Sequence, residues 1–183
     1  YHFQVRAAKD IMRNILMNYY SMDILQAGVG VGKTFIYCQV IRWLVDINYY
    51  KGKTYSPWYC LLVTKASVVE QNKRVAKDGF GLKLRKDITV THYDALRSTA
   101  GSLMLEQKEV VEDGETYKQW VWREGIHPLH FIWDEGQALK NIQSQQSQIG
   151  QGVNDIKDNP YLFQLFSSAT LFTRVCEAKC PAV

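Results

Sequence analysis

Three glycines, a lysine and a threonine stand close together in the stretch LQAGVGVGKTF, residues 25–35. Ala27, Gly32, Lys33 and Thr34 fit the spacing of a phosphate-binding loop, with alanine in the place of its first glycine. Glycines let backbone N–H groups turn toward an anion, the lysine can reach β and γ phosphates, and the threonine hydroxyl can ligate Mg²⁺. We therefore expect a site for a nucleotide and Mg²⁺; the alternative is a glycine-rich turn capped by a threonine. The expected nucleotide-binding residues here are Gly28, Val29, Gly30, Val31, Gly32, Lys33 and Thr34.

An acidic pair follows a second apolar run, where Phe131-Ile132-Trp133 leads into Asp134-Glu135. A carboxylate at the end of a neighbouring strand would complete the metal site, so we expect Asp134 to hold Mg²⁺ together with Thr34. Glu135 would orient and deprotonate an attacking water. With Lys33, these two acids form the expected catalytic set. The alternative is an acidic pair that caps a helix.

Apolar runs alternate with helical patterns along the chain, and these elements would position both groups. We expect strands at 22–28, 59–65, 87–93, 129–135 and 161–170, and helices at 4–16, 34–48 and 67–78. Near-continuous apolar strands separated by helices indicate an α/β fold with a parallel sheet buried on both faces.

Two segments depart from this alternation. Residues 109–122 have two strand-like arms around Asp113-Gly114, which indicates a β-hairpin within a surface insertion at about 101–127. Residues 142–152 are rich in glutamine but too short for a low-complexity tract. Because no repeat or linker is visible, we expect residues 1–183 to form one domain.

Composition excludes several classes of protein. Of the 183 residues, 46% are hydrophobic and 22% are charged, which is typical of a globular chain rather than a disordered one. No apolar run reaches the roughly 20 residues of a membrane span. Four scattered cysteines are too few for a disulfide framework, and Cys176 and Cys180 lack the second pair of a metal site. We expect reduced thiols and a cytoplasmic or nuclear location.

Charge is divided unevenly along the chain. Residues 1–100 carry 15 Lys/Arg against 7 Asp/Glu, whereas residues 101–183 carry 7 against 11. The positive end is concentrated at Lys73, Arg74, Lys77, Lys83, Arg85 and Lys86. Such a cluster is either a solvated helix face and loop or a surface that contacts a phosphate backbone.

Several motifs, in the same order along nearly the whole chain, resemble superfamily-2 helicases and translocases. AGVGVGKT resembles motif I, YCLLVTKASVVEQ is similar to motif Ia with Lys65 in place of the usual proline, and ITVTHYDALR resembles the motif that follows. WDEGQALKN resembles motif II in the form found in Swi/Snf-type ATPases. Ser168-Ala169-Thr170 matches motif III of helicases, where Swi/Snf-type members more often have TGT. YHFQVRAA resembles the start of the fold.

The resemblance implies a RecA-like P-loop NTPase lobe that binds ATP and Mg²⁺ and couples hydrolysis to movement on DNA or RNA, DNA being the favoured track. It also assigns roles to residues outside the loop and the acidic pair. Gln4 would read adenine. Gln137, Ser168, Ala169 and Thr170 would couple nucleotide state to motion. Contacts to nucleic acid would come from Thr64, Lys65, Thr91, His92, Lys73 and Arg74. Arginine fingers would come from a second RecA-like lobe, for which the stretch after motif III has no room.

Two other functions stay open. A viral terminase-type packaging motor also combines a phosphate loop, an acidic pair and a Ser/Thr-Ala-Thr motif, although the residues after Glu135 and the glutamine at position 4 argue against it. A non-catalytic nucleotide-binding module is the second, and the intact Lys33, Thr34 and acidic pair argue against that.

Overall fold

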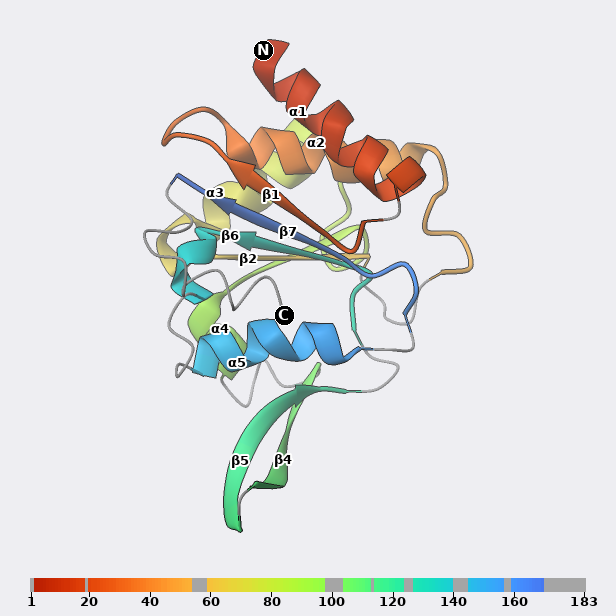
Figure 1. Ribbon diagram of the computed structural model, residues 1–183. Coiled ribbons are helices and arrows are strands. Elements are labelled where there is room, and N and C mark those ends of the chain that lie inside the picture. The colour runs from red at the N-terminus through yellow and green to blue at the C-terminus, as the bar shows by residue number, and fades with distance from the viewer. Residues whose placement is uncertain are drawn as a thin grey trace.

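Five parallel strands form the central sheet of the computed structural model, which describes residues 2–18, 20–53, 59–97, 104–112, 114–123, 127–139, 145–156 and 159–169 (Figure 1). Their order across the sheet is β1-β7-β6-β2-β3, and every neighbouring pair is parallel. The strands are β1 (Met22–Gln26), β2 (Cys60–Thr64), β3 (Ile88–His92), β6 (His130–Asp134) and β7 (Phe163–Ser168). The predicted parallel sheet is confirmed, and each strand is two to four residues shorter than predicted.

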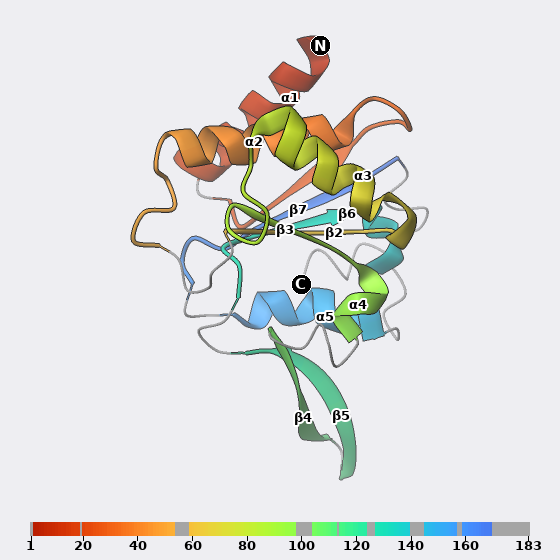
Figure 2. The same ribbon diagram turned by 180° about the vertical axis from the view of Figure 1, so that it is seen from behind.

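Helices cover both faces of this sheet, as the α/β prediction requires. Helices α1 to α3 lie on one face, and α4 and α5 lie on the other (Figures 1 and 2). The helices are α1 (His2–Arg13), α2 (Lys33–Asp46), α3 (Val69–Arg74), α4 (Tyr93–Arg97) and α5 (Gln145–Gly152). Shorter turns extend three of them: π-helical turns at Asn14–Asn18 and Val75–Gly79, and 3₁₀ turns at Ala66–Val68 and Val153–Asp155. A further 3₁₀ turn, Gly136–Leu139, follows β6.

Alternating side chains of the buried strands build a separate core on each face. Strand β2 shows this alternation, since Cys60 and Leu62 pack with α1, α2 and α3, whereas Leu61 and Val63 pack with the opposite layer. All five residues of β2 are buried. A strand that is covered on both faces has no polar side to present, so its sequence is continuously apolar.

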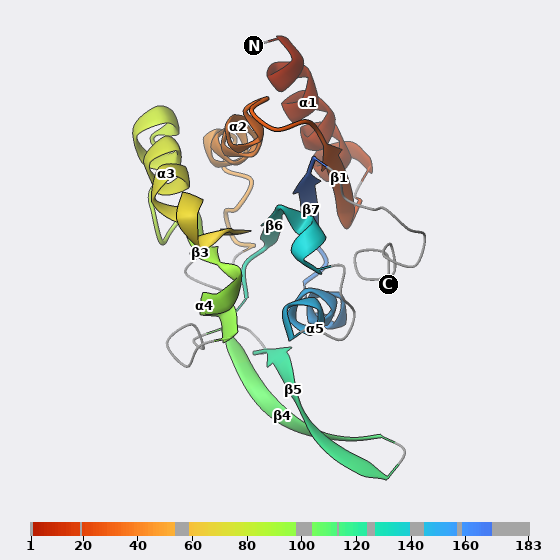
Figure 3. The same cartoon turned by 90° about the vertical axis from the view of Figure 1, so that its left-hand side faces the viewer.

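A two-stranded hairpin projects from the layer of α4 and α5, away from the sheet (Figure 3). Its antiparallel arms are β4 (Leu105–Glu112) and β5 (Glu115–Trp122), and Gly114 supplies the left-handed turn residue with φ 83°. The base is anchored by Trp122, whose indole Nε1 donates to the Ile149 carbonyl over 3.0 Å and whose ring packs edge-on against Phe131. The predicted insertion is therefore a hairpin, and Trp122 belongs to its base rather than to an exposed surface.

Other predictions have mixed outcomes. The glutamine-rich segment contains α5, and the short α4 follows β3; neither helix was predicted. Among the helices that the structure describes, none has the length and apolar character needed to cross a membrane. Cys38 and Cys60 are free, buried thiols. Cys176 and Cys180 lie outside the described residues.

Candidate functional site

The glycine loop, residues 27–32, connects the carboxyl end of β1 to the first residue of α2. Gly30 and Gly32 have φ angles of 79° and 80°, a left-handed conformation that costs glycine little. At the start of the loop, the Ala27 N–H donates to the Ser168 carbonyl at the end of β7 over 3.1 Å. The loop is thereby attached to two adjacent strands, and α2 begins immediately after it.

Lys33 turns back over the glycine loop. Its Nζ donates to the carbonyls of Ala27 at 3.1 Å and Gly28 at 3.3 Å. The ammonium group is consequently held beside the loop backbone, where an anion bound by the loop would also lie. Binding of phosphate by Lys33 stays a prediction.

Gln4 of α1 contacts the same loop. Its Nε2 donates to the Val31 carbonyl over 2.9 Å, and a Cβ added at Gly32 would lie 2.5 Å from that nitrogen. Gly32 is therefore required both by its φ angle and by the approach of Gln4. Recognition of adenine by Gln4 stays a prediction, and the contact shown by the structure is to the loop backbone.

Thr34, the second residue of α2, has two protein partners. Its hydroxyl donates to Asn72 Oδ1 on α3 over 3.1 Å and lies 3.2 Å from the Tyr37 hydroxyl. Tyr37 is fully buried, and its hydroxyl also interacts with Asp134. Tyr37 therefore bridges the two residues that were predicted to ligate Mg²⁺. Hard oxygen donors brought together in this way are of the type that Mg²⁺ prefers.

Asp134 ends β6 and is only 8% exposed. Thr64 Oγ1 donates to its Oδ2 over 2.7 Å, and the Tyr93 hydroxyl donates to its backbone carbonyl over 2.8 Å. Burial raises the pKa of the Asp134 carboxyl, while the hydrogen bond from Thr64 and the charge of Lys33 act in the opposite direction. Loss of the Thr64 hydroxyl or of the Lys33 ammonium would favour the protonated form of Asp134, which cannot serve as a metal ligand.

Glu135, Gln137 and Ser168 form a chain of hydrogen bonds from β6 to β7. Gln137 Nε2 donates to Glu135 Oε2, and Ser168 Oγ donates to Gln137 Oε1. Gln137 and Ser168, two of the residues expected to couple nucleotide state to motion, are therefore in contact. Glu135 has φ 57°, a left-handed backbone conformation that is rare for a residue with a side chain. The backbone therefore changes direction directly after β6. Lys65 Nζ lies 3.8 Å from Glu135 Oε2 on the open side.

The remaining predicted residues are distributed differently. Thr64 is fully buried and bonded to Asp134, which does not agree with direct contact to nucleic acid and gives it the role of holding the acid. Thr91 and His92 are half-buried at the end of β3, and His92 Nδ1 accepts the Ala95 N–H over 3.3 Å. Ala169 is half-buried just after β7, and Thr170 lies outside the described residues.

The basic cluster divides into two groups. Lys73, Arg74 and Lys77 lie on α3 and the π-helical turn after it, and Lys73 pairs with Glu70 at 2.7 Å. The other three cations, Lys83, Arg85 and Lys86, precede β3 at the amino end of the strands. The sequence cluster is thus divided between α3 with its π-helical turn and the segment before β3.

Sequence reasoning missed three partners of the site, Tyr37, Asn72 and Tyr93. The first stands one helical turn after Thr34 on α2, a spacing that places both side chains on one face. The second is a polar residue within an α-helix that is only 3% exposed. Its polarity alone would not separate it from a surface residue.

The structure defines an α/β domain with a five-stranded parallel sheet flanked by helices, and a constellation of loop, cation and acids at the carboxyl ends of its strands. Comparison of the sequence with protein-family models and with curated proteins finds no match.

Proposed function

We propose that this domain is the RecA-like, ATP-binding lobe of a nucleic-acid-dependent ATPase of the superfamily-2 helicase and translocase type. One observation carries the proposal: the glycine loop with Lys33, the buried Asp134 and the bonded chain of Glu135, Gln137 and Ser168 converge at one edge of the sheet. Ligands of open α/β sheets bind in this position, outside the carboxyl ends of the strands.

The glycine loop would bind the phosphates through its backbone N–H groups, aided by the amino end of the 14-residue α2. Lys33 would exchange its carbonyl contacts at Ala27 and Gly28 for phosphate oxygens. Thr34 and Asp134 would hold Mg²⁺, directly or through water, and the ion supplies positive charge for the β and γ phosphates. The hydrogen bond from Thr64 favours the ionised form of Asp134, which that role requires.

Glu135 would orient water and take its proton. The carboxylate accepts from Gln137, and the ammonium of Lys65 lies near the same oxygen. Gln137 also accepts a hydrogen bond from Ser168. A change at the γ-phosphate that displaces Glu135 would therefore displace Gln137 and alter its hydrogen bond to Ser168 at the end of β7. This bonded chain supports the predicted coupling role of Gln137 and Ser168.

Turnover would need a second lobe. An arginine finger is worth roughly 10³–10⁵ in rate, and closure of two lobes excludes water and aligns the attack. We therefore expect this chain to bind Mg·ATP, hydrolyse it slowly by itself, and accelerate when a second lobe and nucleic acid are supplied.

Calorimetry with Mg·ATP tests the proposal. Lys33→Ala should abolish binding while circular dichroism stays unchanged, and Lys77→Ala is the matched control because it removes an exposed lysine on the π-helical turn after α3. Unchanged nucleotide affinity in Lys33→Ala would refute the assignment.

Glu135→Gln should retain ATP binding and lose the hydrolysis that a second lobe restores. Binding without turnover, even with a second lobe and duplex DNA present, would favour the non-catalytic module instead.

A further inference from the structure

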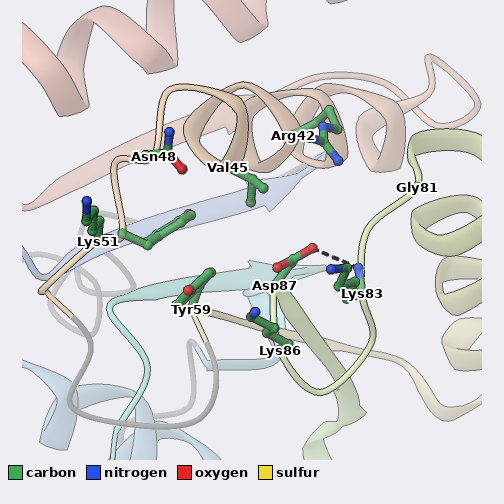
Figure 4. A pocket seen from close by; sticks show the side chains of 10 residues that line it. Arg42, Val45, Asn48, Lys51, Tyr59, Gly81, Lys83, Lys86 and Asp87 are labelled. Carbon is green, nitrogen blue, oxygen red and sulfur yellow. Dashed lines mark hydrogen bonds between the residues drawn. The ribbon is translucent and has the colours of Figure 1, made fainter.

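A second site lies at the opposite end of the sheet from the glycine loop. A cavity of about 380 Å³ opens between the end of α2 and the segment that leads into β3 (Figure 4). Tyr59 directly precedes β2 and Asp87 directly precedes β3, so the cavity faces the amino ends of these parallel strands. The glycine loop follows the carboxyl end of β1, and the cavity therefore shares no residue with the site described above.

The walls carry an excess of positive charge. Lys51, Lys83 and Lys86 line the cavity, and among the described residues none of their ammonium groups has a hydrogen-bond or ion-pair partner. Asp87 is the acid in the lining, and its carboxylate accepts the backbone N–H of Lys83 over 2.8 Å. Arg42 also lines the cavity but is bonded to Asp46, which offsets its charge. The net charge of the cavity lining is therefore about +2.

These cations are not needed to neutralise the end of α2. The carbonyls of Trp43, Leu44 and Val45 already accept backbone N–H groups, from Ile47, Tyr49 and Asn48 respectively. Asn48 makes this possible by adopting φ 53°, which asparagine tolerates better than most residues. The helix carbonyls that would otherwise attract lysines are thus occupied.

A compact turn presents two of the lysines together. The Lys83 carbonyl accepts the N–H groups of Lys86 at 3.2 Å and Asp87 at 2.8 Å, and Arg85 between them has φ 62°. Next to this turn, the Tyr59 N–H donates to the Lys86 carbonyl over 2.9 Å, and the Tyr59 ring is stacked on the buried Tyr50 with centroids 4.3 Å apart. The cavity accordingly combines clustered cations with a fixed aromatic ring.

We infer that this cavity binds the dianionic phosphate monoester of a small molecule. Such a group carries a charge of about −1.5 to −2 at neutral pH, which matches the excess on the walls. Small-molecule sites have volumes of roughly 300–1,000 Å³, so a cavity of about 380 Å³ has room for a ring attached to the phosphate, which Tyr59 can contact. The inference does not depend on nucleotide binding at the glycine loop.

Amide NMR of the 183-residue chain, titrated with inorganic phosphate at constant ionic strength, tests the inference. Saturable shifts are expected at Asn48, Gly81 and Lys83, while Gly30 and Gly32 report separately on the glycine loop. The cavity shifts must persist in Lys33→Ala, in which the glycine loop has lost its lysine. Shifts that vanish in that variant, or cavity amides that do not respond to tens of millimolar phosphate, overturn the inference.

Variants at the walls supply the second part of the test. Lys83→Gln with Lys86→Gln should weaken phosphate binding at the cavity by about 10- to 100-fold, because two charge-assisted contacts are lost. Lys9→Gln with Lys118→Gln removes the same charge from exposed positions on α1 and β5 and should change it by less than about twofold. Equal affinities in the two double variants overturn the inference. If the cavity variant loses the dispersed spectrum of a folded protein, Lys51→Gln on the exposed turn decides, with a loss of about fivefold expected.

Two further probes identify the source of the phosphate. Adenosine 5′-monophosphate should bind the cavity more tightly than inorganic phosphate, because its rings add contacts with Tyr59. A single-stranded oligonucleotide with a 5′ phosphate should bind the cavity no more tightly than one without it. Preference for the phosphorylated oligonucleotide over the monophosphate would overturn the small-molecule assignment.

Discussion

Replacement of Thr64 by valine isolates one interaction of the candidate site. The two side chains have nearly the same shape, but valine has no hydroxyl to donate to Asp134 Oδ2, which lies 2.7 Å from Thr64 Oγ1. Thr64 is fully buried and Asp134 is 8% exposed, so water has little access to replace the lost donor. The variant leaves the carboxylate without this donor in a poorly solvated place.

A hydrogen bond to a charged group contributes about 1.5–3 kcal/mol to stability. For a domain of this size, each kcal/mol corresponds to roughly 2–4 °C in Tm, which gives an expected decrease of about 3–12 °C. The effect depends on pH. Because the Thr64 hydrogen bond lowers the pKa of Asp134, its loss raises that pKa further above the ordinary value. The deficit of Thr64→Val should therefore be full at a pH above the pKa of Asp134 in the variant and shrink as the pH falls through it.

Urea denaturation of the wild type and the variant over a range of pH measures this deficit, and Thr64→Ser is the matched control. Serine keeps the hydroxyl and loses only a buried methyl group, so it should cost about 1 kcal/mol at every pH. If the hydrogen bond matters as argued, Mg²⁺-dependent nucleotide binding should also weaken more in Thr64→Val than in Thr64→Ser. Parallel pH profiles for the two variants would refute the reasoning.

Three other perturbations probe separate parts of the molecule. Burial lowers the pKa of His130 to about 3. The unfolded chain therefore binds a proton near pH 6.5 that the folded protein does not bind, and about 4 kcal/mol of stability should be lost by pH 3. In denaturation curves, His130→Phe should show a smaller loss of stability at low pH. Glu135→Gly should be more stable than Glu135→Ala by up to about 1 kcal/mol, because glycine relieves the left-handed conformation; equal melting temperatures would argue against strain there. Changing Lys73, Arg74 and Lys77 to glutamate should weaken nucleic-acid binding at low salt and reduce the salt slope by about 2–3; unaffected binding would place the nucleic acid on another surface.

The sheet could be predicted from sequence because its strands are buried on both faces. β2 and β6 are short apolar runs that end at charged residues, Lys65 after β2 and Asp134-Glu135 at the end of β6, and such boundaries are visible in one sequence. Helix α5 could not be predicted in the same way. Its sequence QQSQIGQG has weak helical periodicity, and it is held by tertiary contacts, such as the approach of Leu139 to within 3.1 Å of the Cβ position of Gly150.

The site was predictable where chemistry restricts residue type and not where packing decides the partner. Glycines, Lys33 and the acidic pair have a recognisable spacing, and the structure places them at the same edge of the sheet. Thr64 was expected to contact nucleic acid because of the resemblance to helicases. Whether a side chain at a strand end points to solvent or to the neighbouring strand depends on register, here the pairing of β2 with β6.

The pairing of β1 with β7 has a consequence for the order in which the protein folds. Among the strands that the structure describes, β1 lies at one edge of the sheet and its partner β7 is the last in sequence, with Met22 opposite Gln164. Closing a loop of about 140 residues is entropically costly, and contacts of such high sequence separation slow folding. The Ala27–Ser168 hydrogen bond that attaches the glycine loop can form only after that closure. During synthesis the loop would therefore reach its final position late, when β7 has left the ribosome, and a chain that stops before Phe163 would leave β1 as an unpaired, aggregation-prone edge.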